Sequence, residues 1–219
     1  MILAAIVLSP VAAFAQVDTS FQVRYLSNLT VGDSVINITN TGANSTKAFP
    51  TENGNLCVNV YTFSPDEQLV SCCACTVTPN ALVSLSARTD LISNTLTAGV
   101  PTSVVVKLLA TAGSGNGTAC SAATAGAGAN ALFPAGPGGN PIVSGLAAWG
   151  TTIHALPVTP GSPATTYGLT ETAFTPATLS PAELSRITTL CGFIQIDGSG
   201  FGICKSCRLG GLGGSPSAL

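Results

Sequence analysis

The eight cysteines are the residues of this sequence with the clearest chemistry. They form two clusters and three isolated positions: Cys57, Cys72, Cys73, Cys75, Cys120, Cys191, Cys204 and Cys207. An even number of cysteines in an exported chain is typical of a disulfide framework. On a strand, Cys72 and Cys73 would point to opposite faces, so each needs its own partner elsewhere. We therefore expect bridges from the middle of the chain to its C-terminal segment and one at Cys120. The spacing leaves the pairing open.

Three other cysteine chemistries are weaker alternatives. Two cysteine clusters could hold zinc as a Cys₄ site, but an oxidising compartment disfavours it. A redox role for Cys204 and Cys207 would need a helix N-terminus to lower a thiol pKa, and the flanking residues predict no helix. Haem attachment needs a histidine after the second cysteine, where this chain has Arg208. We predict no cofactor and no metal.

Other candidate catalytic groups are sparse. His154 is the single histidine, and no G-x-S-x-G motif accompanies it. Asp66 and Glu67 follow Pro65 in an expected hairpin turn, so solvated carboxylates are the better interpretation than a catalytic pair. Residues 197–202 are glycine-rich, but they lead into the CKSC sequence and not into a helix that could hold phosphate. The sequence therefore predicts a protein that is not an enzyme.

The N-terminus predicts export followed by a long strand. Residues 1–15 are apolar and end in Ala13-Phe14-Ala15, a pattern typical of a cleaved signal peptide. From residue 17 to residue 29 the residue types alternate with a period of two, which indicates a half-buried strand. Four residues of one face are candidates for a contact between subunits: Val17, Phe21, Val23 and Tyr25.

Composition narrows the class of partner. Charged residues make up 7% of the chain, against about 25% in ordinary soluble domains. A surface with few charges costs less to desolvate, so self-association is expected. A net charge of −2 without a basic patch argues against nucleic acid. We expect no membrane span once the signal is removed.

The elements that must position the cysteines are mostly strands. Short runs rich in β-branched and aromatic residues, bounded by turn residues, predict strands over residues 34–40, 56–64, 68–77, 82–87, 102–110 and 147–156. A capping box at Ser180 with Pro181 begins a helix that we expect Gly192 to end, with a last strand over 193–196. The low-complexity residues 111–145 predict a surface excursion, and residues 210–219 a flexible tail.

The segment SVINITNTG at residues 34–42 resembles the strand and turn pattern of exported bacterial immunoglobulin-like domains. The resemblance covers nine residues and implies a fold without implying an activity. Together with the strand spacing, it predicts a mainly β chain. We expect an antiparallel, immunoglobulin-like β-sandwich over residues 16–209, stapled by disulfides, with one short C-terminal helix.

Three functions follow as hypotheses. The first is an exported, non-enzymatic structural subunit of an extracellular assembly, such as a pilus-like filament or a surface layer. In that hypothesis residues 17–29 add as a strand to an open sheet edge of the next subunit, although the same strand could pair within its own sandwich. The second is a secreted monomeric binding or adhesion module with residues 111–145 as its recognition loop. The third is a secreted hydrolase that uses His154.

Overall fold

The computed structural model describes residues 19–43, 54–113, 120–126, 140–157 and 166–207. Its elements follow the chain in this order: β1 (Phe21–Leu26), β2 (Val35–Asn40), β3 (Leu56–Phe63), β4 (Leu69–Val77), β5 (Leu82–Ser86), the short helical turn η1 (Ala87–Leu91), β6 (Val104–Ala112), β7 (Leu146–Ala155), β8 (Tyr167–Ala173), β9 (Thr175–Pro176) and α1 (Pro181–Asp197). The predicted signal peptide (residues 1–15) and flexible tail (residues 210–219) lie outside the described residues.

The strands form two antiparallel sheets that pack against each other. Sheet A has the order β4-β3-β6-β1-β9, and sheet B has the order β5-β2-β7-β8. Most consecutive strands change sheet; β3–β4 and β7–β8 are hairpins within one sheet. The fold class expected from the sequence is confirmed: the described chain is mainly antiparallel β, with two sheets, one helix and four disulfides. The assignment to the immunoglobulin-like group stays a prediction.

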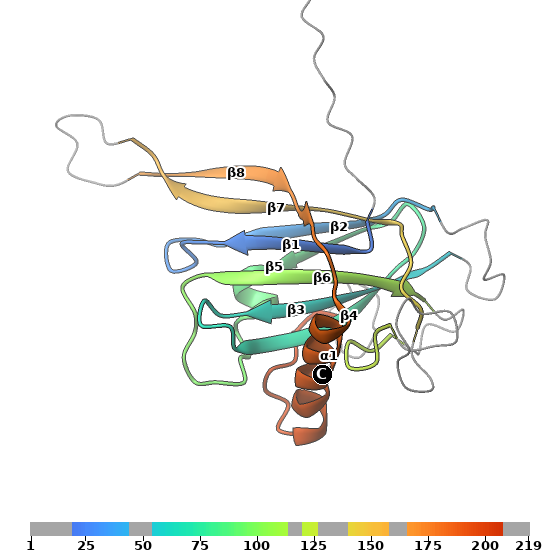
Figure 1. The fold of residues 1–219 in the computed structure, drawn as a ribbon. Coiled ribbons are helices and arrows are strands. Elements are labelled where there is room, and N and C mark those ends of the chain that lie inside the picture. Colours follow the sequence, from blue (N-terminus) through green and yellow to red (C-terminus); the bar gives the residue numbers. More distant parts are fainter. Residues whose placement is uncertain (1–18, 44–53, 114–119, 127–139, 158–165, 208–219) are drawn as a thin grey trace, which may run out of the picture.

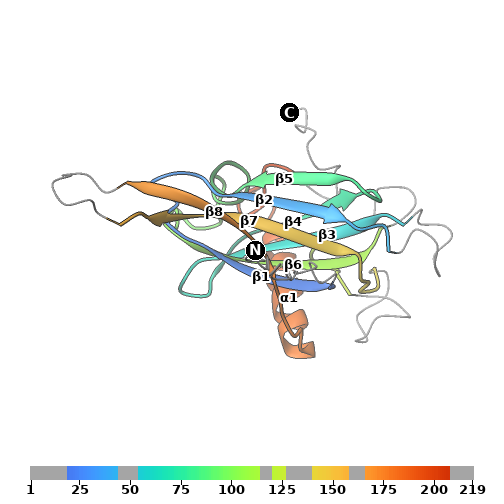
Figure 2. The same cartoon turned by 90° about the horizontal axis from the view of Figure 1, so that it is seen from above.

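A third layer covers the outer face of sheet A. Figure 1 shows α1 against β3 and β4, on the opposite side of the molecule from the β7–β8 hairpin, and Figure 2 shows the same layers from above. One buried cluster lies between the two sheets and contains Ile36, Val60 and Leu108. A second lies between sheet A and α1 and contains Tyr61, Leu109 and Ile187. The strands β3 and β4 of sheet A are therefore buried on both faces.

Burial on both faces explains the composition of the central strands. Every residue of β3 and β4 is buried, so their sequences LCVNVYTF and LVSCCACTV are nearly continuous apolar runs. The register places Val60 opposite Cys73 on one side and opposite Leu108 on the other. The sheet B strands β2 and β5 cover one face only, and their buried and exposed residues alternate.

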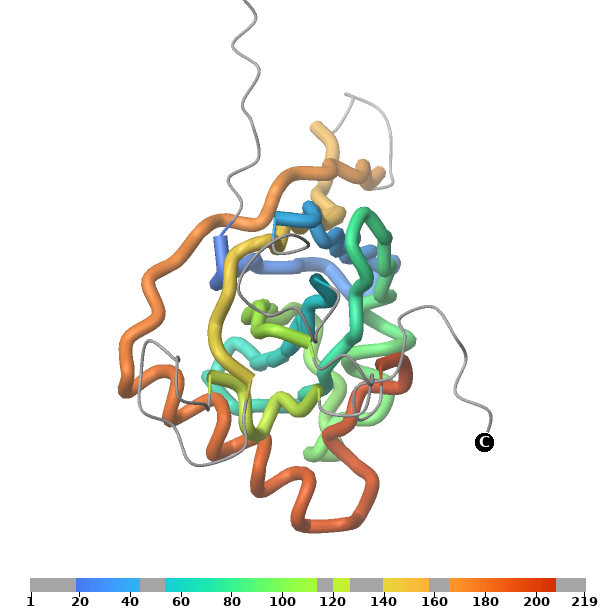
Figure 3. Tube along the Cα trace, turned by 90° about the vertical axis from the view of Figure 1, so that its right-hand side faces the viewer, coloured from blue at the N-terminus to red at the C-terminus, as the bar shows by residue number. Residues whose placement is uncertain are grey.

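The N-terminal strand is shorter than the sequence predicted. Residues 21–26 form β1, and the chain then leaves the sheet, with Asn28 in a left-handed conformation (φ 56°). Figure 3 follows this first part of the trace from the blue end of the chain. The prediction of a strand that continues to residue 29 is therefore wrong, because Asn28 adopts a turn conformation instead of an extended one.

The helix is longer than predicted. Ser180 caps it as expected, since its hydroxyl accepts a hydrogen bond from the Glu183 N–H at 3.1 Å. The helix continues through Gly192 to Asp197, so the predicted stop at Gly192 and the predicted strand over residues 193–196 are both wrong. A helical glycine costs only about 1 kcal/mol relative to alanine, and burial of Ile194 beyond it offsets that cost. The helix ends at Gly198, whose φ of 67° suits glycine.

The predicted surface excursion over residues 111–145 is wrong at several described positions. Thr111 and Ala112 belong to β6, and Ile142 forms an isolated bridge with Thr111. Ala122 and Ala125 are buried against the outer face of sheet A, where the Tyr61 hydroxyl donates a 2.6 Å hydrogen bond to the Ala122 carbonyl. Small residues in this segment allow close packing on the sheet. Residues 114–119 and 127–139 lie outside the described part.

Candidate functional site

All eight cysteines form disulfide bonds, and three of the four bonds start from β4. The pairs are Cys57–Cys120, Cys72–Cys191, Cys73–Cys204 and Cys75–Cys207. Because every cysteine is bonded, none supplies a thiolate ligand for zinc, and Cys204 and Cys207 each bond β4 and not each other.

Two expectations about individual cysteines are confirmed, the opposite directions of Cys72 and Cys73 and the bridge at Cys120. Cys72 and Cys73 point to opposite faces of β4, since Cys72 belongs to the cluster under α1 and Cys73 to the cluster between the sheets. Cys191 faces the core, where it bonds Cys72, and Cys120 is held by a bridge. The middle of the chain is thereby tied to the C-terminal segment, as expected.

Residues 202–204, which the Cys73–Cys204 disulfide ties to β4, lie along the free edge of β4. The Cys72 N–H donates to the Gly202 carbonyl at 2.9 Å, and the Cys204 N–H donates to the Cys72 carbonyl at 3.4 Å. The Leu96 N–H donates to the Val70 carbonyl at 3.0 Å on the same edge. An edge strand with satisfied peptide groups is a poor template for another strand. This edge of sheet A is therefore covered at Val70 and Cys72.

The predicted subunit-contact residues lie in different environments. Phe21 is buried in the cluster under α1, Val23 is partly buried against it, and the Tyr25 side chain is 55% exposed. Val17 lies outside the described residues. Their strand, β1, pairs with β6 of the same chain over its whole length and with β9 at Gln22 and Val23. Donation of this strand to another subunit would require it to leave β6, and the intersubunit role stays a prediction.

The opposite face of β1 makes a polar connection to sheet B. Arg24 donates to the hydroxyls of Thr152 and Thr172 and, at 3.2 Å, to the Ala173 carbonyl. Burial lowers the pKa of its guanidinium, and the carboxylate of Glu171 partly opposes that change. Gly150 leaves room for this side chain, because a Cβ there would lie 2.7 Å from Arg24 Cδ and Nε.

The other groups considered for catalysis do not form a catalytic arrangement within the described residues. His154 is exposed and its Nδ1 lies 3.3 Å from the Thr170 hydroxyl. Asp66 and Glu67 lie in the β3–β4 turn, as expected, where Asp66 accepts a hydrogen bond from Ser64. No group of three or more metal-ligating side chains occurs in the described part of the chain. Among the described residues there is also no helix long and apolar enough to cross a bilayer.

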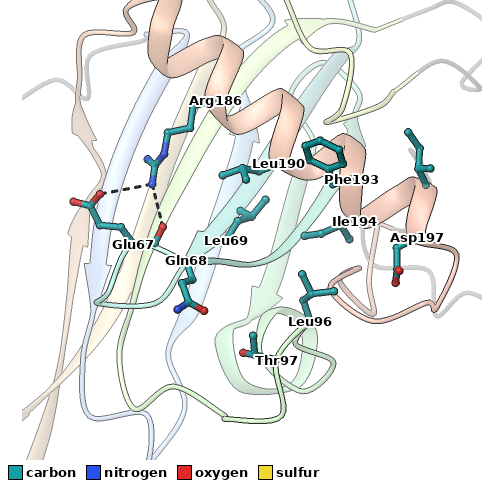
Figure 4. Close-up of a pocket in the computed structure, with 11 residues that line it drawn as sticks. Glu67, Gln68, Leu69, Leu96, Thr97, Arg186, Leu190, Phe193, Ile194 and Asp197 are labelled. Atoms are coloured by element: carbon teal, nitrogen blue, oxygen red, sulfur yellow. Dashed lines mark hydrogen bonds and ion pairs between the residues drawn. The ribbon is translucent and has the colours of Figure 1, made fainter.

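A groove of about 730 Å³ lies between α1 and the start of β4. Its apolar lining comes from both sides of the gap, and Figure 4 shows Leu190, Phe193 and Ile194 of the helix facing Leu69 and Leu96. Leu69 and Ile194 are buried at its floor, whereas Leu96 and Phe193 are 43% and 67% exposed. A volume between about 300 and 1,000 Å³ with mostly apolar walls is typical of small-molecule sites.

The charged end of this groove is already neutralised. Arg186 lies 3.6 Å from the Glu67 carboxylate and 3.5 Å from that of Glu183, and it donates to the Glu67 carbonyl at 3.0 Å (Figure 4). Glu183 also pairs with Lys107, whose ammonium lies 4.6 Å from the Phe63 ring centroid. These contacts fix α1 on sheet A. Arg186 is therefore occupied within the chain and is a poor anchor for an anionic ligand.

Strand β8 is the most exposed long strand of the described chain. Six of its seven residues are exposed, and Leu169 and Tyr167 are 66% and 42% exposed. It pairs with β7 on one side, and no described strand pairs with its other side. β7 meets β2 only up to Gly150, so the β7–β8 hairpin extends past its neighbour (Figure 1). This edge of sheet B is open.

Sequence reasoning missed both the groove and β8. The groove combines helix residues with Leu96 and Thr97 from a loop, and no local pattern connects those segments. β8 carried a usable signal, since Tyr167, Thr170 and Thr172 have high strand propensity and follow a turn-rich stretch with Pro160 and Pro163. Its lack of a buried face removed the alternation that reveals most strands.

No protein-family model, curated protein or solved structure matches this chain. Its function is therefore inferred from the disulfides, the groove between α1 and β4, and the open edge of β8.

Proposed function

We propose that this chain is an exported, non-enzymatic structural subunit that self-associates in an extracellular assembly through the open edge of sheet B. The observation that carries the proposal is the contrast between the edges. The β4 edge of sheet A is covered at Val70 and Cys72 by hydrogen bonds with Leu96 and with the C-terminal segment, whereas β8 is exposed and pairs with no strand on its outer side within the described residues. Unpaired peptide groups on an exposed strand are a template for a further strand.

Two properties of the chain support this proposal. Four disulfides in one chain of this size are typical of proteins that fold in oxidising compartments, outside the cytosol. A charged fraction of 7% lowers the cost of burying one subunit surface on another. The edge at β8 replaces the N-terminal strand as the favoured site of addition, because β1 is already paired with β6.

Light scattering coupled to size-exclusion chromatography tests the proposal, with negative-stain microscopy of the same non-reduced protein. We expect the average mass to rise above that of one chain as concentration increases, and ordered particles larger than one chain to be visible. A monomer at every accessible concentration, without particles, would contradict self-association.

The groove favours a second candidate function, a secreted binding module. Its apolar floor and exposed rim would take the apolar part of a small ligand. A fluorescent hydrophobic dye tests this function. Leu96→Glu should abolish dye binding, whereas the control Leu82→Glu, at a 63% exposed residue of β5 outside the groove, should leave it unchanged. Equal binding by both variants would contradict a ligand site in the groove.

A further inference from the structure

The peptide groups of β8 alternate between its two edges. The Leu156 N–H donates to the Thr166 carbonyl, and the Phe174 N–H donates to the Ala148 carbonyl, each at 2.8 Å. The register between these points has no shift, so even-numbered residues of β8 bond β7. The odd-numbered residues must then point their N–H and C=O groups at the open edge. The Ala173 carbonyl agrees with this direction, because it accepts its hydrogen bond from Arg24, outside β7.

Tyr167, Leu169 and Glu171 therefore present both peptide groups on the open edge, and Ala173 presents its N–H there, because its carbonyl already accepts from Arg24. β8 contains no lysine, arginine, proline or bulge, and its one charged residue is Glu171. The other edge of sheet B, at β5, is less available. β5 is shorter, and the carboxylate of Asp90 accepts the outward Ser86 N–H at 2.7 Å.

We propose that β8 pairs antiparallel with the β8 of a second copy of this chain, about a two-fold axis that passes beside Thr170. This inference rests on the proposed function and names its partner. In this register Leu169 lies opposite Glu171 of the second copy, and Tyr167 lies opposite Ala173. All four outward residues then meet outward residues, and the two copies share one continuous sheet with β8 strands at its centre.

Charge selects this register over its neighbours. Glu171 is the one charged residue of β8. An axis beside Glu171 would place the two carboxylates directly opposite each other, which is destabilising. An axis beside Leu169 would leave Ala173 unpaired and shorten the ladder. The axis beside Thr170 keeps the full strand length and puts each carboxylate opposite a leucine.

An engineered cysteine distinguishes this register from others. Thr170 would face Thr170 of the second copy as a non-hydrogen-bonded pair with Cα atoms about 4.5 Å apart, which falls within the disulfide range of about 4.4–6.8 Å. We expect Thr170→Cys to form a dimer on non-reducing gels that reductant converts to monomer. Leu169→Cys is the matched control, because its diagonal counterpart would lie about 7–8 Å away and should not bond.

The outcomes separate this inference from the proposed function. A monomeric Thr170→Cys variant, when light scattering shows that the wild type associates, would overturn β8 pairing and leave self-association through another surface. Cross-linking of both cysteine variants to the same extent would overturn the register. A wild-type protein that stays monomeric, with no cross-linking of either variant, would overturn both proposals. Dimers from Thr170→Cys alone, together with loss of association in Leu169→Pro but not in Leu169→Ala, would support the pairing, since proline removes an outward N–H.

Discussion

The disulfides give a quantitative prediction, because two of them have similar burial but close loops of very different size. Cys57 and Cys120 are separated by 63 residues, and no other bridge offers a shorter path between them. Cys75 and Cys207 are separated by 132 residues, but the neighbouring bridge Cys73–Cys204 already joins the same segments. Once the Cys73–Cys204 bridge has formed, the Cys75–Cys207 bridge closes only a small additional loop. That loop spans two residues from Cys73 to Cys75 and three from Cys204 to Cys207.

Loop-closure entropy converts this difference into free energy. Closing the 63-residue loop between Cys57 and Cys120 contributes about 4 kcal/mol to the free energy of unfolding. Closing about five residues contributes about 2 kcal/mol for Cys75–Cys207. Replacing either pair by alanine removes two sulfurs that are at most 4% exposed, so the cavity contributions should be similar. The double variant C57A/C120A should therefore lose about 2 kcal/mol more unfolding free energy than C75A/C207A.

Denaturant unfolding without reductant, followed by circular dichroism, measures both losses. The slope of the unfolding free energy against denaturant should also rise more in C57A/C120A, because its unfolded chain gains more freedom and exposes more surface. Equal losses in the two variants, or a larger loss in C75A/C207A, would refute the loop-entropy reasoning. Such a result would mean that native contacts around the bridges dominate their contribution.

Three further substitutions test single contacts. Gly150→Ala should destabilise the fold by about 1–3 kcal/mol, because its Cβ would meet the Arg24 side chain, and Arg24→Ala should recover part of that loss in a double-mutant cycle. Tyr61→Phe should cost about 1–2 kcal/mol at neutral pH, since the Ala122 carbonyl loses its donor. Burial raises the pKa of the Tyr61 hydroxyl in the folded protein. The contribution of this hydroxyl to the free energy of unfolding is therefore complete below about pH 10 and falls at higher pH. A denaturation series should show that the wild type loses about 1.4 kcal/mol more than Tyr61→Phe by about pH 11. Gly198→Ala should lower the melting temperature by the equivalent of about 1 kcal/mol, because the helix ends there in a left-handed conformation, and an unchanged temperature would contradict that role.

The sequence predicted the elements whose signals are local. β-branched runs between turn residues located β3, β4 and β6, and the capping box located the start of α1. The opposite directions of Cys72 and Cys73 followed from the period of a strand. These features depend on a few neighbouring residues, and tertiary contacts did not change them.

The features that sequence reasoning missed depend on distant contacts. Gly192 alone predicts the end of a helix. α1 continues past it because the Ile194 side chain is buried between α1 and sheet A. The pairing of the cysteines depends on which segments meet in space, and the third layer brings Cys191 over Cys72. β8 has no buried face, so it lacks the alternation that would mark it as a strand.

The unequal protection of the strand edges connects the fold to the proposed assembly. Three disulfides tie β4 to α1 and to the C-terminal segment, and Gly202 and Cys204 of that segment hydrogen-bond the Cys72 peptide groups on the β4 edge. β8 belongs to the same chain but has no covering segment among the described residues, and a lysine or proline on it would have been sufficient to discourage pairing. In the proposed assembly, an exposed seven-residue strand without a lysine or proline would be the surface at which folded subunits associate. The disulfides hold β3, β4, α1 and the C-terminal segment together, so we expect that association to join subunits edge to edge with this part of each subunit intact.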